Sequence, residues 1–170
     1  MSHTAQTKVE YRDKGALGKA ILGMGGKVLG EGQYRLFGGP ETGFGFTLSG
    51  WRYPLVLTSD RTLKFDDYEG EWGNRADLDR LKIEYAAAVV ESKCAELCWS
   101  TQRESNGSIT IYHPGGTIVV TPDGTVDAVG FQGRGCEAAV DAIAAALGEE
   151  TARYCKPEAN IVRNEAKQVL

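Results

Sequence analysis

The sequence has few of the side chains that most often ligate metals. It contains 2 histidines and 4 cysteines among 170 residues. Cys94 and Cys98 lie one helical turn apart, but a zinc site needs about four ligands. The remaining candidates are scattered along the chain at His3, His113, Cys136 and Cys155. We therefore expect no metal and no cofactor.

An excess of basic charge and long apolar runs are also missing. The chain has 19 basic and 23 acidic residues, a net charge of −4 and a pI near 5.3. This balance gives no general attraction to nucleic-acid phosphates or anionic lipid. No apolar run approaches the roughly 20 residues that span a bilayer, and residues 2–15 lack the apolar core of a signal peptide. We expect a protein of the reducing cytoplasm with no membrane association.

Familiar catalytic and nucleotide-binding motifs are missing as well. There is no GxxxxGK[ST] loop, no GxGxxG that opens a helix, no Ser-His-Asp set and no paired-carboxylate motif. Glycine, by contrast, is abundant: 22 in all, of which twelve fall between Gly15 and Gly50. Such density either cradles a ligand or serves turns and bulges, and we favour turns and bulges. We expect no catalytic residues and a chain that is not an enzyme on its own.

The longest regular element predicted is a helix within residues 74–99, with Asp77 as its N-cap. Two adjacent apolar rows recur at three- and four-residue intervals, which is typical of an amphipathic helix with a wide buried face. The rows are Leu78, Leu81, Tyr85 and Val89, and Ile83, Ala87, Val90, Cys94 and Leu97. A shorter helix is expected after Asp13, and another along the stripe from Cys136 to Leu147, with Gly148 at its C-cap.

Most of the remaining chain alternates as strands separated by turns. The order predicts an α+β fold: an antiparallel sheet with helices on one face, in a ferredoxin-like order with an inserted hairpin. A docked C-terminal β-hairpin–helix unit follows, with its turn at Pro122-Asp123-Gly124. We place domain boundaries at 1–113 and 114–150, followed by a tail at 151–170. In the tail, Val162, Ala166 and Val169 form a short helical stripe unless the end frays.

Two parts of the chain resemble protein families of unknown function. The Ser2-His3 start, the early helix, Tyr68–Gly73 and the Leu78–Leu97 helix resemble a family of conserved hypothetical proteins of algal plastids and cyanobacteria. That likeness covers about residues 1–112. Residues 117–158 resemble a second, short family through the landmarks Pro122-Asp123-Gly124, Gly133-Arg134-Gly135-Cys136, Leu147-Gly148 and Lys156-Pro157-Glu158. Both resemblances imply an accessory role beside an AAA+ ATPase, and neither supplies catalytic residues.

Cys136 and the residues before it form one candidate site. Gly133, Arg134 and Gly135 open a helix, whose N-terminus favours an anion or a thiolate. Cys136 also falls on the apolar stripe of that helix, and no histidine is near in sequence to act as its base. We favour packing for Cys136 and keep two alternatives open: an anion or ligand site, and a thiol-dependent enzyme.

Phe44 and Phe46 belong to a Gly-aromatic-Gly-aromatic run on a predicted strand. RNA-recognition modules stack bases on aromatic residues in such a run. Here the preceding basic position is Thr42, the later aromatic position is Ser49, and the chain is acidic. We expect both rings to point into the core, with nucleic-acid binding as the alternative function.

Trp51, Tyr68 and Trp72 lie in or near an acidic segment. Aromatic side chains dominate the energetics of protein interfaces, so an exposed group of this kind would suit a protein partner. The alternative is that the three rings cap the open end of a sheet. Our leading expectation is a cytoplasmic accessory or interaction protein whose partner is an AAA+ ATPase.

Overall fold

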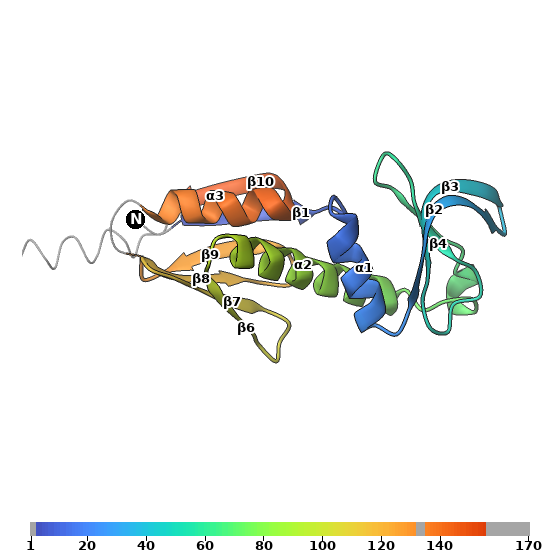
Figure 1. Ribbon diagram of the computed structural model, residues 1–170, viewed down its shortest axis with the longest axis horizontal. Helices are drawn as coiled ribbons and strands as arrows, with labels where there is room; N and C mark the ends of the chain where they lie inside the picture. Colours follow the sequence, from blue (N-terminus) through green and yellow to red (C-terminus); the bar gives the residue numbers. More distant parts are fainter. Residues whose placement is uncertain (1–2, 132–134, 156–170) are drawn as a thin grey trace, which may run out of the picture. The chain divides into compact units, whose positions relative to one another are not determined.

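A computed structural model describes residues 3–131 and 135–155 of the chain. The chain divides into two compact units, one of Met1–Glu10 with Val89–Leu170 and the other of Tyr11–Ala88. Helices combine with antiparallel sheets (Figure 1), which confirms the α+β class. Val162, Ala166 and Val169 lie outside the described residues.

The first unit contains a six-stranded antiparallel sheet in the order β10-β1-β9-β8-β7-β6. Its strands are β1 (His3–Val9), β6 (Ser100–Arg103), β7 (Ile109–His113), β8 (Gly116–Val120), β9 (Thr125–Val129) and β10 (Gly148–Cys155). Helix α3 (Gly135–Leu147) packs along β1, β9 and β10 (Figure 1). The sheet therefore joins the N-terminal strand to the C-terminal part of the chain.

One face of this sheet is buried and the other is open. Ile111, Ile118 and Ala128 are cross-strand neighbours on β7, β8 and β9, and all three are fully buried. On the opposite face the adjacent row includes Tyr112 and Val129, both of which are exposed. The predicted stripe of α3 is buried at Cys136, Ala139, Val140, Ile143 and Leu147. Alternation along each strand thus directs most of the apolar side chains to the buried face, while Tyr112 and Val129 remain exposed on the other.

The second unit contains a four-stranded antiparallel sheet in the order β2-β3-β4-β5. Its strands are β2 (Lys27–Leu36), β3 (Gly39–Thr47), β4 (Leu55–Leu57) and β5 (Leu63–Lys64). Helix α1 (Lys14–Gly23) precedes them, the 3₁₀ turn η1 (Tyr68–Gly70) follows them, and α2 (Ala76–Glu96) contributes residues to both units. Phe44 and Phe46 on β3 pair with Leu57 and Leu55, and all four are buried.

Polar side chains define where the first two helices begin. Asp13 caps α1 as predicted, because its Oδ1 accepts a hydrogen bond from Ala16 N–H at 3.0 Å. The predicted cap of α2 was wrong: Asn74, not Asp77, accepts from Ala76 N–H, at 3.0 Å. Asp77 lies one residue inside α2. Its Oδ2 accepts a hydrogen bond from Trp51 Nε1 at 3.0 Å.

Glycines in the β2–β3 hairpin make room for the ring of Tyr34. Gly30, Gly32 and Tyr34 alternate onto one face of β2, and strand pairing places Gly45 beside Gly30. Tyr34 Oη donates a hydrogen bond to the Gly30 carbonyl at 2.6 Å. A Cβ atom at Gly45 would lie closer than van der Waals contact to the Tyr34 ring. These glycines serve packing, in line with the structural interpretation of the glycine-rich stretch.

The arrangement of strands differs from the predicted one in three respects. The strands form two sheets instead of one ferredoxin-like sheet, because among the described strands β2–β5 pair only with one another. The predicted C-terminal hairpin, β8–β9, is an integral part of the larger sheet, in which β9 pairs with β1. Gly148 begins strand β10 directly after α3 instead of capping that helix, and β10 pairs with β1. The two compact units accordingly divide the chain at places other than 113/114 and 150/151.

Candidate functional site

Four aromatic side chains from three separate segments meet in the second unit. Phe37 belongs to the β2–β3 turn, Tyr53 to the segment before β4, and Tyr68 and Trp72 to the segment around η1. The ring centroid of Trp72 lies 4.6 Å from that of Tyr68, 5.0 Å from Phe37 and 5.4 Å from Tyr53. Distances in this range are typical of favourable aromatic pairs. We call Phe37, Tyr53, Tyr68 and Trp72 the aromatic cluster.

Backbone hydrogen bonds hold the segments that carry the aromatic cluster. Phe37 N–H donates to Asp66 Oδ2 at 2.6 Å. Arg52 N–H donates to the Trp72 carbonyl at 2.8 Å, and Trp72 N–H donates to the Asp67 carbonyl at 2.9 Å. Because these bonds hold the backbone of the three segments before any partner arrives, binding would need little additional ordering of the backbone.

The aromatic cluster is exposed at two of its four members. Phe37 is 69% exposed and Tyr68 is 59% exposed, whereas Tyr53 and Trp72 are half-buried. Contiguous exposed apolar surface of this kind marks interaction sites more often than scattered single residues do. The arrangement resembles an interface hot spot, in which a half-buried tryptophan supports exposed aromatic neighbours.

The segment that carries Tyr68 has an unusual backbone conformation. Tyr68 and Glu69 have φ angles of 42° and 54°, and Gly70 follows at 95°. The left-handed region is uncommon for residues with a Cβ atom and costs on the order of 1–3 kcal/mol for each residue. In this conformation the Tyr68 ring stacks on Trp72 with an interplanar angle of 22°. Strained residues of this kind concentrate at binding sites.

Charged groups surround the aromatic cluster. The guanidinium of Arg52 lies over the rings of Trp72 and Tyr53, 5.3 Å and 5.8 Å from their centroids, which is cation–π geometry. Glu69 and Glu71 are exposed in the same segment. Among the described residues neither glutamate makes an ion pair. The site therefore combines aromatic faces that accept a cation with unpaired acidic side chains.

Asp67 and Arg75 form an ion pair beside the aromatic cluster. The hydrogen bond from Arg75 lowers the pKa of Asp67 below its usual value of 3.8. Because the pKa is lower in the folded state than in the unfolded state, the pair stabilises the fold above about pH 4. That contribution is lost as the pH falls through the folded-state pKa.

We predict that Asp67→Asn makes stability less sensitive to acid. The variant lacks the ionised carboxylate, so its free energy of unfolding should fall less than that of the wild type between about pH 4 and pH 2. Urea denaturation at a series of pH values measures this difference. Parallel pH profiles for the two proteins would show that the ion pair contributes nothing.

Two of the three aromatic residues predicted for a partner surface lie together. Tyr68 and Trp72 are stacked in the aromatic cluster. Trp51 packs elsewhere in the same unit: it donates to Asp77 and meets Phe65 edge-on at 5.9 Å between centroids. Gly73 is required beneath its indole, since a Cβ atom there would clash with the ring. Trp51 thus has a structural role at the start of α2.

Sequence reasoning missed Phe37 and Tyr53, the other two members of the aromatic cluster. Phe37 and Gly38 form the turn between β2 and β3, where a large apolar side chain is unusual because turns are typically polar. That exposed position was the available signal for Phe37. Nothing local distinguishes Tyr53, which joins the cluster only through tertiary structure.

Phe44 and Phe46, the candidates for stacking on nucleic-acid bases, are buried in the core of the second unit. They pack on the face that carries Leu55 and Leu57, their partners on β4. Base stacking requires aromatic faces that are open to the ligand. The two rings instead have the core position that we favoured from the sequence.

The site proposed around Cys136 is described only in part. Gly133 and Arg134 lie outside the described residues, while Gly135 and Cys136 open α3 as predicted. Cys136 is buried on the same stripe as Ile143. This position fits the packing role, because a reactive thiol must be accessible to its substrate.

Cys94 and Cys98, one helical turn apart in the sequence, have different environments: one thiol is buried and the other is exposed. Cys94 is buried, and burial, followed by the nearby Glu91, raises the pKa of its thiol to about 11. Cys98 is exposed just after α2. Within the described part of the chain, no group of three or more histidine, cysteine or acidic residues could hold a metal ion.

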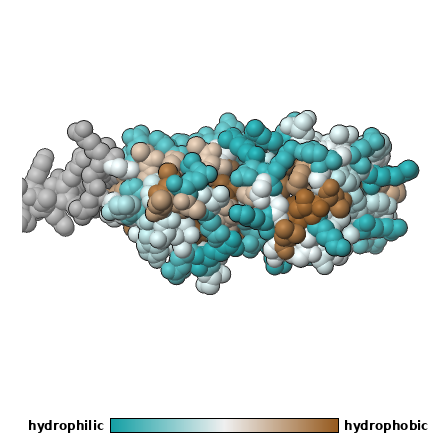
Figure 2. Space-filling model, in the orientation of Figure 1, coloured by the Kyte–Doolittle hydropathy of each residue, from teal (hydrophilic) through white to brown (hydrophobic). Residues whose placement is uncertain are grey.

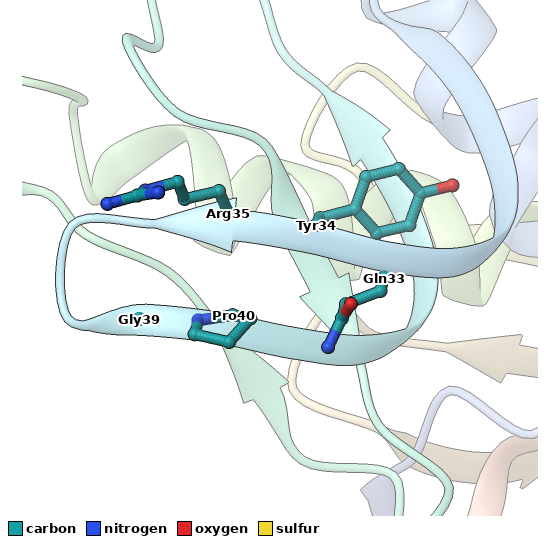
Figure 3. A pocket seen from close by; sticks show the side chains of 5 residues that line it. All are labelled: Gln33, Tyr34, Arg35, Gly39 and Pro40. Atoms are coloured by element: carbon teal, nitrogen blue, oxygen red, sulfur yellow. The ribbon is translucent and has the colours of Figure 1, made fainter.

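A pocket of about 360 Å³ lies on the β2–β3 hairpin (Figure 3). Its lining residues all come from that hairpin: Gln33, Tyr34, Arg35, Gly39 and Pro40. The lining offers an amide, a phenol and a guanidinium but no carboxylate, imidazole or thiol. It therefore lacks the groups that acid–base or nucleophilic catalysis most often uses.

Comparison of the chain with protein-family models, with curated proteins and with solved structures finds no match. The two family resemblances and the AAA+ ATPase association stay predictions for that reason. Among the described residues, no helix has the length and apolar character needed to cross a membrane.

Proposed function

We propose that this protein is a non-enzymatic accessory protein that binds a protein partner through the aromatic cluster. The observation that supports the proposal best is the joint exposure of Phe37 and Tyr68 against the half-buried Trp72. Tyrosine and tryptophan supply large contact area with few rotatable bonds. Truncating such a residue in an interface typically costs about 2 kcal/mol or more of binding free energy.

The charges around the aromatic cluster favour a basic surface on the partner. Glu69 and Glu71 would attract lysine and arginine side chains, and the rings of Tyr68 and Phe37 would accept their cationic groups. The family resemblances point to an AAA+ ATPase as the partner class. We accordingly propose an association that changes with the nucleotide state of such an ATPase.

Affinity purification of the tagged full-length protein, with and without ATP, tests this function. We expect wild type to retain an ATPase in a nucleotide-dependent manner and Tyr68→Ala to lose it. Tyr112→Ala is the matched control, since Tyr112 is an exposed aromatic residue of the other unit, at 49% exposure. Equal recovery with Tyr68→Ala and wild type, or loss only with Tyr112→Ala, would overturn the proposed surface.

A further inference from the structure

Strand β2 is an outer strand of its sheet, and in the part of the chain that the structure describes it is paired on one side only. From Gly43 to the turn, β2 and β3 pair with no third described strand, because β4 pairs with Phe44, Gly45 and Phe46 of β3 (Figure 1). A two-stranded ribbon is marginally stable in water, and an open edge is a template for a further strand. The outer edge of β2 is therefore a place where another strand can add.

The pairing of β4 with β5, at the other end of the sheet, shows in which direction the N–H and C=O groups of each β2 residue point. Thr58 N–H donates to the Thr62 carbonyl at 3.0 Å, so the backbone groups of Thr58 face β5. This direction alternates along an antiparallel strand, and Leu57 therefore faces β3. Leu57 pairs with Phe44, so the N–H and C=O groups of Phe44 point to β4. Those of its neighbour Gly43 therefore point to β2.

The same alternation leaves three residues of β2 with backbone groups that point outward. Gly43 pairs with Gly32, whose N–H and C=O groups are thus used within the hairpin. The backbone N–H and C=O groups of Glu31, Gln33 and Arg35 therefore point to the open edge of β2, because the direction alternates along the strand. No described residue makes a hydrogen bond with these outward groups.

The side chains along this edge are self-complementary about Gln33. In an antiparallel pair of two β2 strands centred on Gln33, each Glu31 lies opposite Arg35 of the other copy. Opposite charges at directly opposed positions stabilise a strand pair. Arg35 makes no ion pair among the described residues, whereas Glu31 already pairs with Lys14. The second copy would therefore give Arg35 its first acidic partner.

Apolar side chains on either side of Glu31 and Arg35 are also arranged symmetrically about Gln33. Leu29 lies four residues before Gln33 and Phe37 four residues after it, and both are exposed. The same pairing places Leu29, at the bulge of β2, on the side of Phe37 in the turn of the other copy. Leu22 and Val28 are exposed nearby, and Figure 2 shows apolar side chains gathered over α1 and the beginning of β2. Burial of this surface would add to the strand pairing.

We propose that β2 binds β2 of a second copy of this chain in an antiparallel, two-fold symmetric pair centred on Gln33. The contact is isologous, so the same patch serves both partners. Glu31, Gln33 and Arg35 each exchange two hydrogen bonds with their opposite residue, about six in total. Since the contact is short, it should give a weak, reversible dimer with a dissociation constant of about 1–100 µM.

Sedimentation equilibrium of the full chain against concentration measures this dimer. Gln33→Pro removes an N–H group that the monomer does not use, and proline is tolerated at such edge positions. We expect this variant to raise the dissociation constant at least about tenfold, while Gln33→Thr, which keeps the N–H group, changes it little. A wild-type monomer up to about 0.5 mM, or a dimer that Gln33→Pro leaves unchanged, would overturn the proposal.

Charge reversal tests the register of the pair. Glu31→Arg and Arg35→Glu each place like charges opposite one another and should weaken the dimer, whereas the double variant should restore it. Circular dichroism of each variant verifies that the fold is retained. Failure of the double variant to recover the wild-type dissociation constant would contradict the register centred on Gln33.

A cysteine at the centre of the pair gives a second readout. Hydrogen-bonded partners in antiparallel strands have Cα atoms about 5.5 Å apart, within the range of a disulfide. In a Cys98→Ser background, Gln33→Cys should form an interchain disulfide on mild oxidation. Thr42→Cys, on the strand next to β2, should not. Equal cross-linking of both variants would contradict the pair. These tests use the purified chain without the partner proposed above and substitute no residue of the aromatic cluster, so their failure would leave the proposed function untouched.

Discussion

Replacing Gly45 with alanine is expected to destabilise the second unit by about 1–3 kcal/mol. The added Cβ atom would overlap the ring of Tyr34, which lies across Gly45 and is held by its hydrogen bond to the Gly30 carbonyl. Either the ring leaves this position or the two strands separate. Chemical denaturation followed by tryptophan fluorescence measures the change in unfolding free energy.

A double-mutant cycle distinguishes this clash from a general effect of alanine. In a Tyr34→Ala background, Gly45→Ala should cost much less, because the group that it displaces is gone. Gly23→Ala is the control: its Cβ atom would meet nothing within 4 Å, and its φ angle is not positive. That variant should be neutral or slightly stabilising. An equal cost of Gly45→Ala with and without Tyr34 would show that the ring is not the cause.

The second large effect is expected from Tyr85→Phe. Tyr85 is fully buried on α2, and its Oη accepts hydrogen bonds from Arg12 N–H at 2.9 Å and Asp13 N–H at 3.0 Å. Removing the hydroxyl leaves two backbone donors at the start of α1 without this acceptor. Both hydrogen bonds are part-buried, and a typical hydrogen bond contributes about 0.5–1.5 kcal/mol, so we expect a total loss of about 1–3 kcal/mol.

Tyr112→Phe is the matched control for this prediction. The Tyr112 hydroxyl donates to Gln102 Oε1 at 3.2 Å on an exposed face, where water can replace the bond, so its removal should cost about 0.5 kcal/mol or less. Amide hydrogen exchange should locate the effect of Tyr85→Phe at residues 11–23. An effect of similar size from both substitutions would contradict the role assigned to Tyr85.

Elements defined by local patterns could be predicted from the sequence. The apolar stripe of α3 and the Asp123-Gly124 turn depend on residues that are close together in the chain. The cap of α2 was predicted wrongly because Asn74 and Asp77 both suit an N-cap. In the fold, Asn74 accepts from Ala76 N–H, and the Asp77 carboxylate accepts from the indole N–H of Trp51 instead.

The pairing of strands could not be predicted, because it depends on contacts between distant parts of the chain. Strand β1 lies between β9 and β10, more than 110 residues away in sequence. Strand β10 itself was missed because Glu149, Glu150 and Arg153 make its sequence too polar for a buried strand. It is an edge strand, and Arg153 forms ion pairs with Glu150 and with Asp141 of α3.

In the aromatic cluster, likewise, the residues that are close in sequence could be predicted and those from other segments could not. Tyr68 and Trp72 lie four residues apart in one acidic segment, and the sequence predicted them together. Phe37 and Tyr53 join them from other segments, and no periodicity links these positions. Phe37 also belongs to the proposed β2 pair, so dimer formation and partner binding would compete for its exposed face.

Site-specific photocrosslinking tests the partner surface most directly. A benzophenone side chain at position 68 or 37 replaces an exposed aromatic residue with a larger one, and position 112 provides the same probe on the other unit. We predict that irradiation in the cells that produce the protein links positions 68 and 37, but not 112, to an AAA+ ATPase, with yields that change when ATP is depleted. Crosslinks to the ATPase only from position 112, or none from 68 and 37 in cells where the tagged wild type retains the ATPase, would contradict the account.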